Sequence, residues 1–226
     1  IVLDEVYGIE SSAFANDRKP AINYTDFPVV KTHELPDRLV PSDPEIPAVY
    51  IVRDGRDALV SIAHHRKDII APGTNFNDNL RTAILAKEDS HFGGWSNNVN
   101  NWLKRASIVI KFEDLIVNPI ETIEKIRPLI DLPEPQLEKL PSFGELKNTS
   151  FKYISSNSKL NADELSRKFF RRGKVGAWKE EMPEELQRLF WKIHGKTMIE
   201  LGYEDKIPEF PKQGILNSLT NLLRRR

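Results

Sequence analysis

Three short apolar runs, rich in β-branched residues, mark the chain at 27–30, 48–52 and 108–112. Continuous runs of this kind, without strict alternation, are typical of parallel strands that are covered on both faces. Each run ends in polar or charged residues. In an open parallel sheet ligands bind at the carboxyl ends of the strands, so we expect the chemistry of the molecule to lie there.

Apolar residues between and after these runs recur at helical spacing. The predicted buried faces are Leu59, Ile62 and Ala63, then Trp95, Val99, Trp102 and Leu103, and then Ile120, Ile123 and Ile126. Asn118, with Pro119 in the first turn, supplies a capping side chain for the last of these helices. The longest helix is predicted to run from near Pro183 to Gly202, because glycine suits a helix C-terminus. Its predicted buried stripe is Leu186, Leu189, Phe190, Ile193 and Leu201.

This alternation of strands and helices predicts an α/β fold with a mostly parallel central sheet. The 226 residues suffice for one domain with its own core, and no boundary is visible. Proline-rich stretches at 36–47 and 128–141 are interpreted as connectors inside that domain. The chain begins at Ile1 without an initiator methionine, so we expect it to be a fragment or an incompletely ordered chain.

The composition narrows the function. Lys plus Arg and Asp plus Glu number 33 each, so the net charge is zero. A general attraction to nucleic acid or to an anionic membrane is therefore not expected, and any anion must be bound by a local cluster. The absence of cysteine excludes disulfides and thiolate zinc sites. No signal peptide or membrane-spanning run is visible, and we expect a cytoplasmic location.

The segment from Tyr50 to Ser61 carries the strongest chemical signal. Its strand delivers Arg53 to the end of the sheet, Gly55 permits a tight turn, and Asp57 is predicted to cap the next helix. Ser61 is then placed about one turn into that helix. An arginine fork, a hydroxyl and free helix N–H groups together form a phosphate site. An ordinary strand–turn–helix with surface ion pairs explains the segment about equally well.

A second basic segment runs from Arg171 to Trp178. Arg171, Arg172 and Lys174 stand around Gly173, and a second glycine follows, so the backbone can approach an anion closely. Trp178 is predicted to anchor this loop in the core. A solvated basic turn is the common alternative, although such turns rarely combine two glycines with a tryptophan.

A third polar segment, Lys31–Thr32–His33, follows the first apolar run. His33 suits general-base work near neutral pH, and Lys31 beside it can stabilise charge on a transferred group. A lone histidine is more often structural, so this motif is weak by itself. No His, Asp or Glu cluster has metal-ligand spacing, and no metal is predicted.

In this order the segments resemble the soluble sulfotransferases that use 3′-phosphoadenosine 5′-phosphosulfate (PAPS). The resemblance spans roughly residues 27–203 and implies a three-layer, P-loop-like sulfotransferase fold. The implied cofactor-binding residues are Arg53 and Ser61 for the 3′-phosphate, Arg171, Arg172 and Gly173 of the basic motif, and Phe112, Thr149 and Phe151 at the adenine. The chain departs from the family at Arg172, which replaces Lys, at Ala177, which replaces Asp, and at Phe112, which replaces Tyr.

The resemblance also implies the reaction, which is in-line transfer of a sulfuryl group to a hydroxyl or amine of the acceptor. His33 is then the catalytic base and Lys31 contacts the sulfuryl oxygens, leaving 3′-phosphoadenosine 5′-phosphate (PAP) as a product. The acceptor, whether a small molecule, a lipid or a glycan, cannot be read from the sequence. Nucleic acid is not expected as a partner, and formation of a homodimer stays open.

One family element is missing. The loop of the Lys-Ser-Gly-Thr-Thr type that binds the 5′-phosphosulfate is not found before His33. We therefore treat residues 1–226 as a single sulfotransferase domain, and either its phosphosulfate loop precedes Ile1 or the chain is not catalytic.

Three other readings stay open. A sulfotransferase-like module could hold an adenosine bisphosphate without turnover. A P-loop kinase or NTPase would require a Gly-Lys-Ser/Thr loop that is not found. A protein without a small ligand is disfavoured, because its two basic loops would repel each other without an anion.

Overall fold

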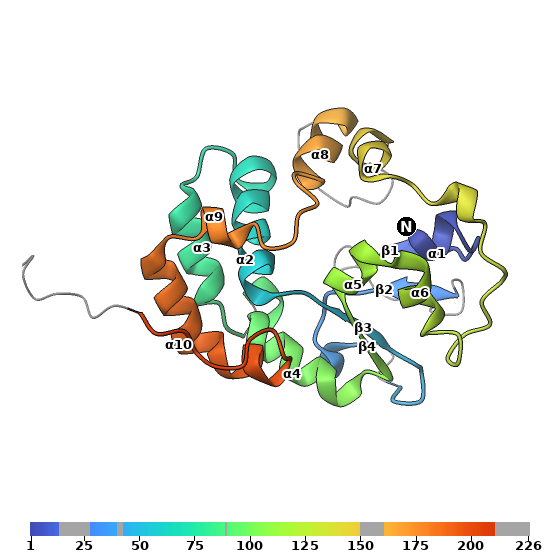
Figure 1. The fold of residues 1–226 in the computed structure, drawn as a ribbon, viewed down its shortest axis with the longest axis horizontal. Coiled ribbons are helices and arrows are strands. Elements are labelled where there is room, and N and C mark those ends of the chain that lie inside the picture. The colour runs from blue at the N-terminus through green and yellow to red at the C-terminus, as the bar shows by residue number, and fades with distance from the viewer. Residues whose placement is uncertain (14–27, 40–42, 89, 150–160, 211–226) are drawn as a thin grey trace, which may run out of the picture.

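The computed structural model describes residues 1–13, 28–39, 43–88, 90–149 and 161–210 (Figure 1). The strands are β1 (Ser11–Ala13), β2 (Val29–Lys31), β3 (Val49–Val52) and β4 (Ile108–Lys111). The longer helices are α2 (Gly55–His65), α3 (Phe76–Ile84), α4 (Trp95–Arg105), α8 (Ala162–Phe169) and α10 (Glu184–Glu200). The shorter helices are α1 (Val2–Glu5), α5 (Phe112–Val117), α6 (Pro119–Glu124), α7 (Phe143–Thr149) and α9 (Trp178–Glu181).

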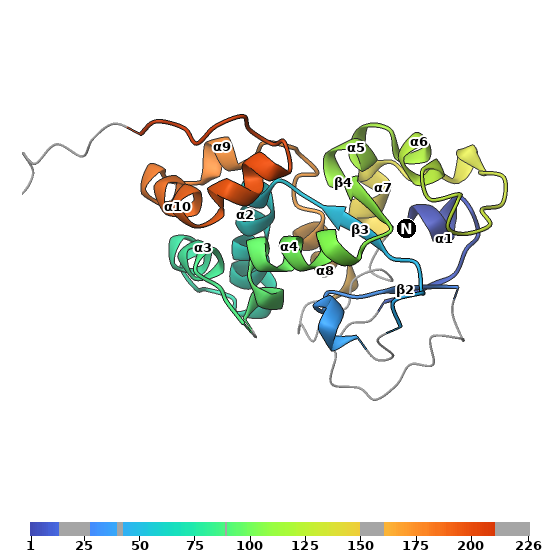
Figure 2. The same cartoon turned by 90° about the horizontal axis from the view of Figure 1, so that it is seen from below.

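The strands pair in parallel, as the apolar runs predicted. β1 pairs with β2, and β3 pairs with β4 in a register that sets Val49 opposite Ile108 and Val52 opposite Lys111. Over the described residues these are two separate two-stranded sheets. The view in Figure 2 places β2 apart from the β3–β4 pair, which runs into the middle of the molecule.

The prediction that the strands are covered on both faces was wrong for β3 and β4. Val49, Ile51 and Val109 are 38%, 48% and 40% exposed, whereas Val52 and Ile110 are buried. The core cluster that covers Ile110 comes from the α1 and α6 side and does not extend over the three exposed residues. The burial of this sheet is therefore one-sided.

Two apolar cores flank β3 (Figure 1). The larger one lies among α2, α3 and α10, and the smaller one joins α1, β4 and α6. The buried members of the larger core are Leu59, Val60, Ala63, Leu80, Ala83, Ile84, Met182, Leu186, Phe190, Trp191 and Met198. β3 thus leads from one core to the other and delivers its last residues beside α2.

The longest helix has the predicted ends. Pro183 is the N-cap of α10, and Gly202 follows the C-cap with a φ of +66°. The N–H of Gly202 donates to the carbonyl of Ile199, and that of Tyr203 donates to Met198. This pair of bonds is a Schellman motif, whose left-handed residue favours glycine.

The helical faces follow the prediction in part. Leu186 and Phe190 are buried, but Ile193 and Leu103 are each 38% exposed, so their assignment to buried stripes was wrong. Neighbouring residues on the inward-facing side of the helix are buried instead, such as His194. Asn118 precedes α6 as predicted, but its side chain makes no capping hydrogen bond.

No helix in the part of the chain that the structure describes is long and apolar enough to cross a bilayer.

Candidate anion site

The first turn of α2 is built differently from the prediction. Asp54, not Asp57, is the N-cap, and its carboxylate accepts a hydrogen bond from the Arg56 N–H at 2.9 Å. Gly55 begins the helix and makes no left-handed turn. Glycine is required there because a Cβ would lie 2.8 Å from the ring of Trp95. Glycine at position 55 thus serves the close packing of α2 against α4, and not the tight turn that was predicted.

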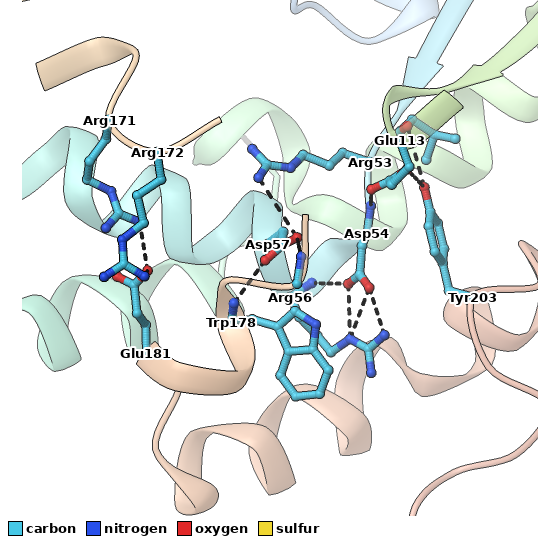
Figure 3. Close-up of polar contacts among 12 residues, drawn as sticks. Arg53, Asp54, Arg56, Asp57, Glu113, Arg171, Arg172, Trp178, Glu181 and Tyr203 are labelled. Atoms are coloured by element: carbon cyan, nitrogen blue, oxygen red, sulfur yellow. Dashed lines mark hydrogen bonds and ion pairs between the residues drawn. The ribbon is translucent and has the colours of Figure 1, made fainter. Parts of the chain in front are cut away.

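Asp57 instead joins the two basic segments. Its side chain is buried, and its carboxylate accepts hydrogen bonds from the backbone N–H groups of Gly176 at 2.6 Å and Trp178 at 2.9 Å. The same carboxylate lies 3.9 Å from the Arg53 guanidinium (Figure 3). The strand end at Arg53 and the start of α9 are therefore held at one carboxylate.

Arg53 has the properties of an anion ligand. Its guanidinium lies over the ring of Phe112, with 4.7 Å between the guanidinium carbon and the ring centroid. The Nε atom is buried and has no hydrogen-bond partner among the residues that the structure describes. A buried N–H without an acceptor is costly, so this donor fits a ligand oxygen.

Ser61 does not share the first turn of α2. It lies in the second turn, on the exposed side of the helix. The prediction that it stands within about one turn of the helix start, beside the free N–H groups, was wrong by most of a turn.

Arg56, which the sequence did not single out, fixes the base of the site. It is buried, its guanidinium pairs with Asp54 and Glu204 at 2.7 Å each, and it lies 4.0 Å from the centroid of the Trp178 ring. Burial alone would lower the pKa of Arg56, but the two carboxylates raise it overall. Trp178 therefore anchors the basic loop as predicted, packed against the larger core with a cation–π contact.

The cations of the basic loop are paired within the protein. Arg171 contacts Glu181 at 2.9 Å, and Arg172 contacts Glu180 at 3.0 Å and Glu181 at 3.2 Å. Lys174 contacts Glu180 at 2.5 Å. The expectation that the basic segments repel each other unless an anion is bound was wrong, because these two glutamates and Asp57 supply the counter-charge.

Gly173 shapes the same loop. Its φ is +57°, and a Cβ on it would lie 2.4 Å from the ring of Phe143. Both the backbone conformation and the close approach to α7 therefore require glycine here. Phe143 in turn contacts Phe170, with 6.4 Å between the ring centroids.

The Lys31–His33 segment lies at the end of β2. His33 is exposed and its ring lies 4.8 Å from that of Phe92. Lys31 is also largely exposed, yet loss of water around its ammonium group lowers its pKa. Trp102 ties this segment to β3, because its indole N–H donates to the Glu34 carbonyl at 3.0 Å while its ring stacks on Tyr50.

A family model described as "Sulfotransferase domain" matches residues 3–202. The chain belongs to the sulfotransferase family. Among curated relatives, it is 30% identical over 164 residues to sulfotransferase 1A1 of Canis lupus familiaris, which covers 67% of this chain and 55% of that protein. It is 26% identical over 216 residues to 3-alpha-hydroxysteroid sulfotransferase of Cavia porcellus, covering 84% of this chain and 73% of that protein.

Solved sulfotransferase-like structures share the fold. Mouse sulfotransferase SULT7A1, crystallised with PAP, superposes with a TM-score of 0.69 at 19% identity, over 89% of this chain and 80% of that one. Retinol dehydratase gives a TM-score of 0.57 at 20% identity, over 85% and 58%. The predicted α/β sulfotransferase fold is thus confirmed. The chain spans 55% and 64% of the length of the first two curated relatives.

The structure describes only part of the set of residues that were predicted to line the adenine. Phe112 begins α5 and faces Arg53. Thr149 ends α7, where its side chain is not described, and Phe151 lies outside the described residues. Over the described ranges no group of three His, Asp or Glu side chains could hold a metal ion.

Two surface hollows have volumes of about 390 and 340 Å³, and the second is lined in part by Glu113 and Asp114, which directly follow Phe112. One is lined from α4 and α10, and the other from α5, α6 and Lys125.

In Figure 3 the guanidinium groups of Arg171 and Arg172 turn onto Glu181 and not toward Arg53. A phosphate that binds all three arginines would therefore have to draw two of them away from Glu181.

Sequence reasoning missed the acidic half of this site. Glu180 and Glu181 directly follow the basic loop and balance it, and Asp57 receives its backbone N–H groups. Within residues 171–181 a basic loop is followed by two adjacent glutamates. This charge pattern could have predicted that the glutamates pair with the loop. Nothing in the local sequence indicated the partner of Asp57.

Proposed function

We propose that this chain is the part of a sulfotransferase that binds the 3′-phosphate end of PAPS and activates the acceptor. The main support is the Asp57 carboxylate, which holds the strand end at Arg53 and the basic loop before Trp178 at one place. A family match over residues 3–202 makes sulfuryl transfer the reaction class to which these motifs belong.

Arg53 and the basic loop are proposed to bind the 3′-phosphate. Over the described ranges the buried Nε of Arg53 has no acceptor, and a phosphate oxygen would satisfy it with a charge-assisted hydrogen bond. Arg171 and Arg172 add two guanidinium groups, and Gly173 belongs to the same proposal by resemblance. Ser61, in the second turn of α2, is placed in the same proposal by resemblance only.

The adenine is proposed to lie near Phe112, with Thr149 and Phe151 beside it. Arg53 already covers one face of the Phe112 ring, so a purine would stack on the other face. PAPS supplies a sulfuryl group on a phosphate leaving group, and the protein contributes position and charge stabilisation.

His33 is proposed as the base that takes the proton of the acceptor hydroxyl, with Lys31 toward the sulfuryl oxygens. Both side chains are exposed at the end of β2, where an acceptor can reach them. The Cavia porcellus relative is named for a hydroxysteroid, which supports a small hydroxyl compound as the acceptor class. A relative named cytosolic sulfotransferase 5, from Arabidopsis thaliana and 27% identical, supports a cytoplasmic location.

Calorimetry with two nucleotides tests the proposal. Adenosine 3′,5′-bisphosphate should bind more tightly than adenosine 5′-monophosphate, which lacks the 3′-phosphate. Arg53→Ala should weaken the bisphosphate at least about tenfold, since a charge-assisted hydrogen bond contributes roughly 1.5–3 kcal/mol. Arg66→Ala, at an exposed position after α2, is the matched control and should change little.

Equal affinity for the two nucleotides would contradict the proposed phosphate site. Transfer of radiolabelled sulfate from PAPS by the full-length protein then separates an enzyme from a module that only binds the nucleotide.

A further inference from the structure

The carboxylate of Glu181 occupies the position that an anion would take on the basic loop. One oxygen lies 2.9 Å from Arg171 and 3.2 Å from Arg172. The other lies 2.5 Å from Nε2 of His64 on α2. Figure 3 shows both arginine side chains converging on this one group.

Glu181 differs from its neighbour Glu180 in burial. The Glu181 side chain is 12% exposed, whereas that of Glu180 is 54% exposed. Exposed ion pairs contribute little because water and salt screen them, but a desolvated carboxylate depends on its partners. Burial would raise the pKa of Glu181, yet hydrogen bonds from Arg171 and His64 lower it overall. The group therefore stays ionised and neutralises the loop.

We infer that Glu181 is an internal competitor for the 3′-phosphate, which must displace its carboxylate from Arg171 and Arg172 to bind. This inference rests on the proposed function. A singly charged anion would only replace the single negative charge of the Glu181 carboxylate that it displaces. A phosphate monoester brings a charge of about −1.5 to −2 and three acceptor oxygens. Glu181 thus reserves the loop for a dianionic phosphate.

The displaced carboxylate keeps a partner. His64 contacts the oxygen of Glu181 that faces away from the arginines, and its own Nδ1 lies 3.6 Å from Asp68. The exchange therefore does not require Glu181 to become a buried charge without a hydrogen bond, which would cost several kcal/mol. His64 provides the resting position of the released carboxylate.

Glu181→Gln tests the competition, because it keeps the shape of the side chain and removes its charge. Adenosine 3′,5′-bisphosphate should bind about ten- to a hundredfold more tightly to this variant, as expected when a competing charged hydrogen bond is lost. Adenosine 5′-monophosphate, without the 3′-phosphate, should bind unchanged. A structural role of Glu181 would alter both nucleotides together.

Glu185→Gln is the matched control, since it makes the same change four residues away at an exposed pair with Arg81, and it should alter bisphosphate affinity less than about threefold. Thermal unfolding of both variants checks that each is folded. Should Glu181→Gln prove unfolded, Glu181→Asp replaces it, since the shorter side chain weakens the same contacts, and a bisphosphate affinity no tighter than that of the parent chain would then overturn the inference.

Unchanged or weaker bisphosphate binding by folded Glu181→Gln would overturn the inference, and would make Glu181 a group that positions the arginines. That outcome leaves the proposed function intact as long as the parent chain prefers the bisphosphate over the monophosphate. Loss of that preference in the parent chain contradicts the proposed function instead, so the two failures are distinguishable.

Discussion

The carboxylate of Asp57 accepts the backbone N–H of Trp178 at 2.9 Å, and these two residues are 121 positions apart in the chain. Asp57 contacts the N–H of Gly176 as well, and its side chain is almost completely buried. The basic loop is thus held by its backbone, which leaves its arginine side chains available for other partners.

Asp57→Asn should destabilise the protein and misplace the loop. The amide keeps one acceptor oxygen but turns an NH2 group toward backbone donors, so one buried N–H loses its acceptor. The expected loss is about 2 kcal/mol of unfolding free energy, measured by urea denaturation. Asp131→Asn, at an exposed position, is the matched control and should change little. Equal stability of the two variants would show that Asp57 does not hold the loop.

Gly173→Ala should move the basic loop away from α7. A left-handed φ costs a non-glycine residue about 1–2 kcal/mol, and the new Cβ would also collide with the ring of Phe143. Gly176→Ala has the same strain at φ +79° but no atom within 4 Å of the new Cβ, so it isolates the backbone effect.

Combining Gly173→Ala with Phe143→Ala should recover part of the stability that Gly173→Ala alone removes. A double-mutant cycle on unfolding free energies measures this coupling. Strict additivity would mean that Phe143 does not shape the loop.

Stability should fall in acid because of His194. The Nε2–H of this buried ring donates to the Ile84 carbonyl, and its Nδ1 accepts from the Ser96 hydroxyl. Burial lowers the pKa of His194 to about 4 from the ordinary value of 6.5. The unfolded state therefore takes up the proton first as the pH falls. The contribution of His194 is fully present above about pH 6.5 and is lost progressively toward pH 4, by about 3 kcal/mol.

His194→Gln removes this titration but keeps a polar side chain. The variant should be less stable than the parent chain at pH 7.5, and the difference should shrink by about 3 kcal/mol at pH 4. Urea unfolding at both pH values measures it. His65 and His91, whose pKa values burial also lowers, titrate in both proteins and cancel. A constant difference between the two proteins would exclude this role of His194.

His33→Ala should lower the rate of sulfuryl transfer by about 10²–10⁴-fold, the usual contribution of a general base. The affinity for adenosine 3′,5′-bisphosphate should be unchanged, because His33 lies at the end of β2 and not with the arginines of the proposed phosphate site. A steady-state transfer assay on the full-length protein and calorimetry on the same variant give the two values. Loss of nucleotide binding would refute the assignment.

The sequence predicted the elements better than their contacts. Apolar runs and helical spacing located β3, β4, α2 and α10, because burial and backbone geometry leave a local signature. The open face around Ile51 could not be predicted, since it depends on which elements fail to cover the sheet. The cap assigned to Asp57 failed for a related reason, because Asp54 and Asp57 both suit a cap locally and only the distant loop decides between them.

The candidate site divides in the same way. The arginines at 53, 171 and 172 were read from motifs, and the structure brings their segments together through Asp57. Their present partners were not predicted, because Glu181 approaches them through a folded helix and is held in place by His64 from α2. Local pattern thus located the residues that we propose to bind the anion, whereas tertiary packing determines their contacts within the protein.

Asp57 bonds to Gly176 and Trp178, which follow it by 119 and 121 positions. These contacts therefore form late during synthesis of the chain. Closing so long a loop costs the chain conformational entropy. The contact cannot form until the residues around Trp178 have left the ribosome. The strand end at Arg53 therefore leaves the ribosome before the loop that Asp57 holds. A nascent chain cut short before Trp178 would carry Arg53 and α2 but not the contact between Asp57 and the basic loop. Nucleotide affinity of such truncated chains would test whether this contact assembles the proposed anion site.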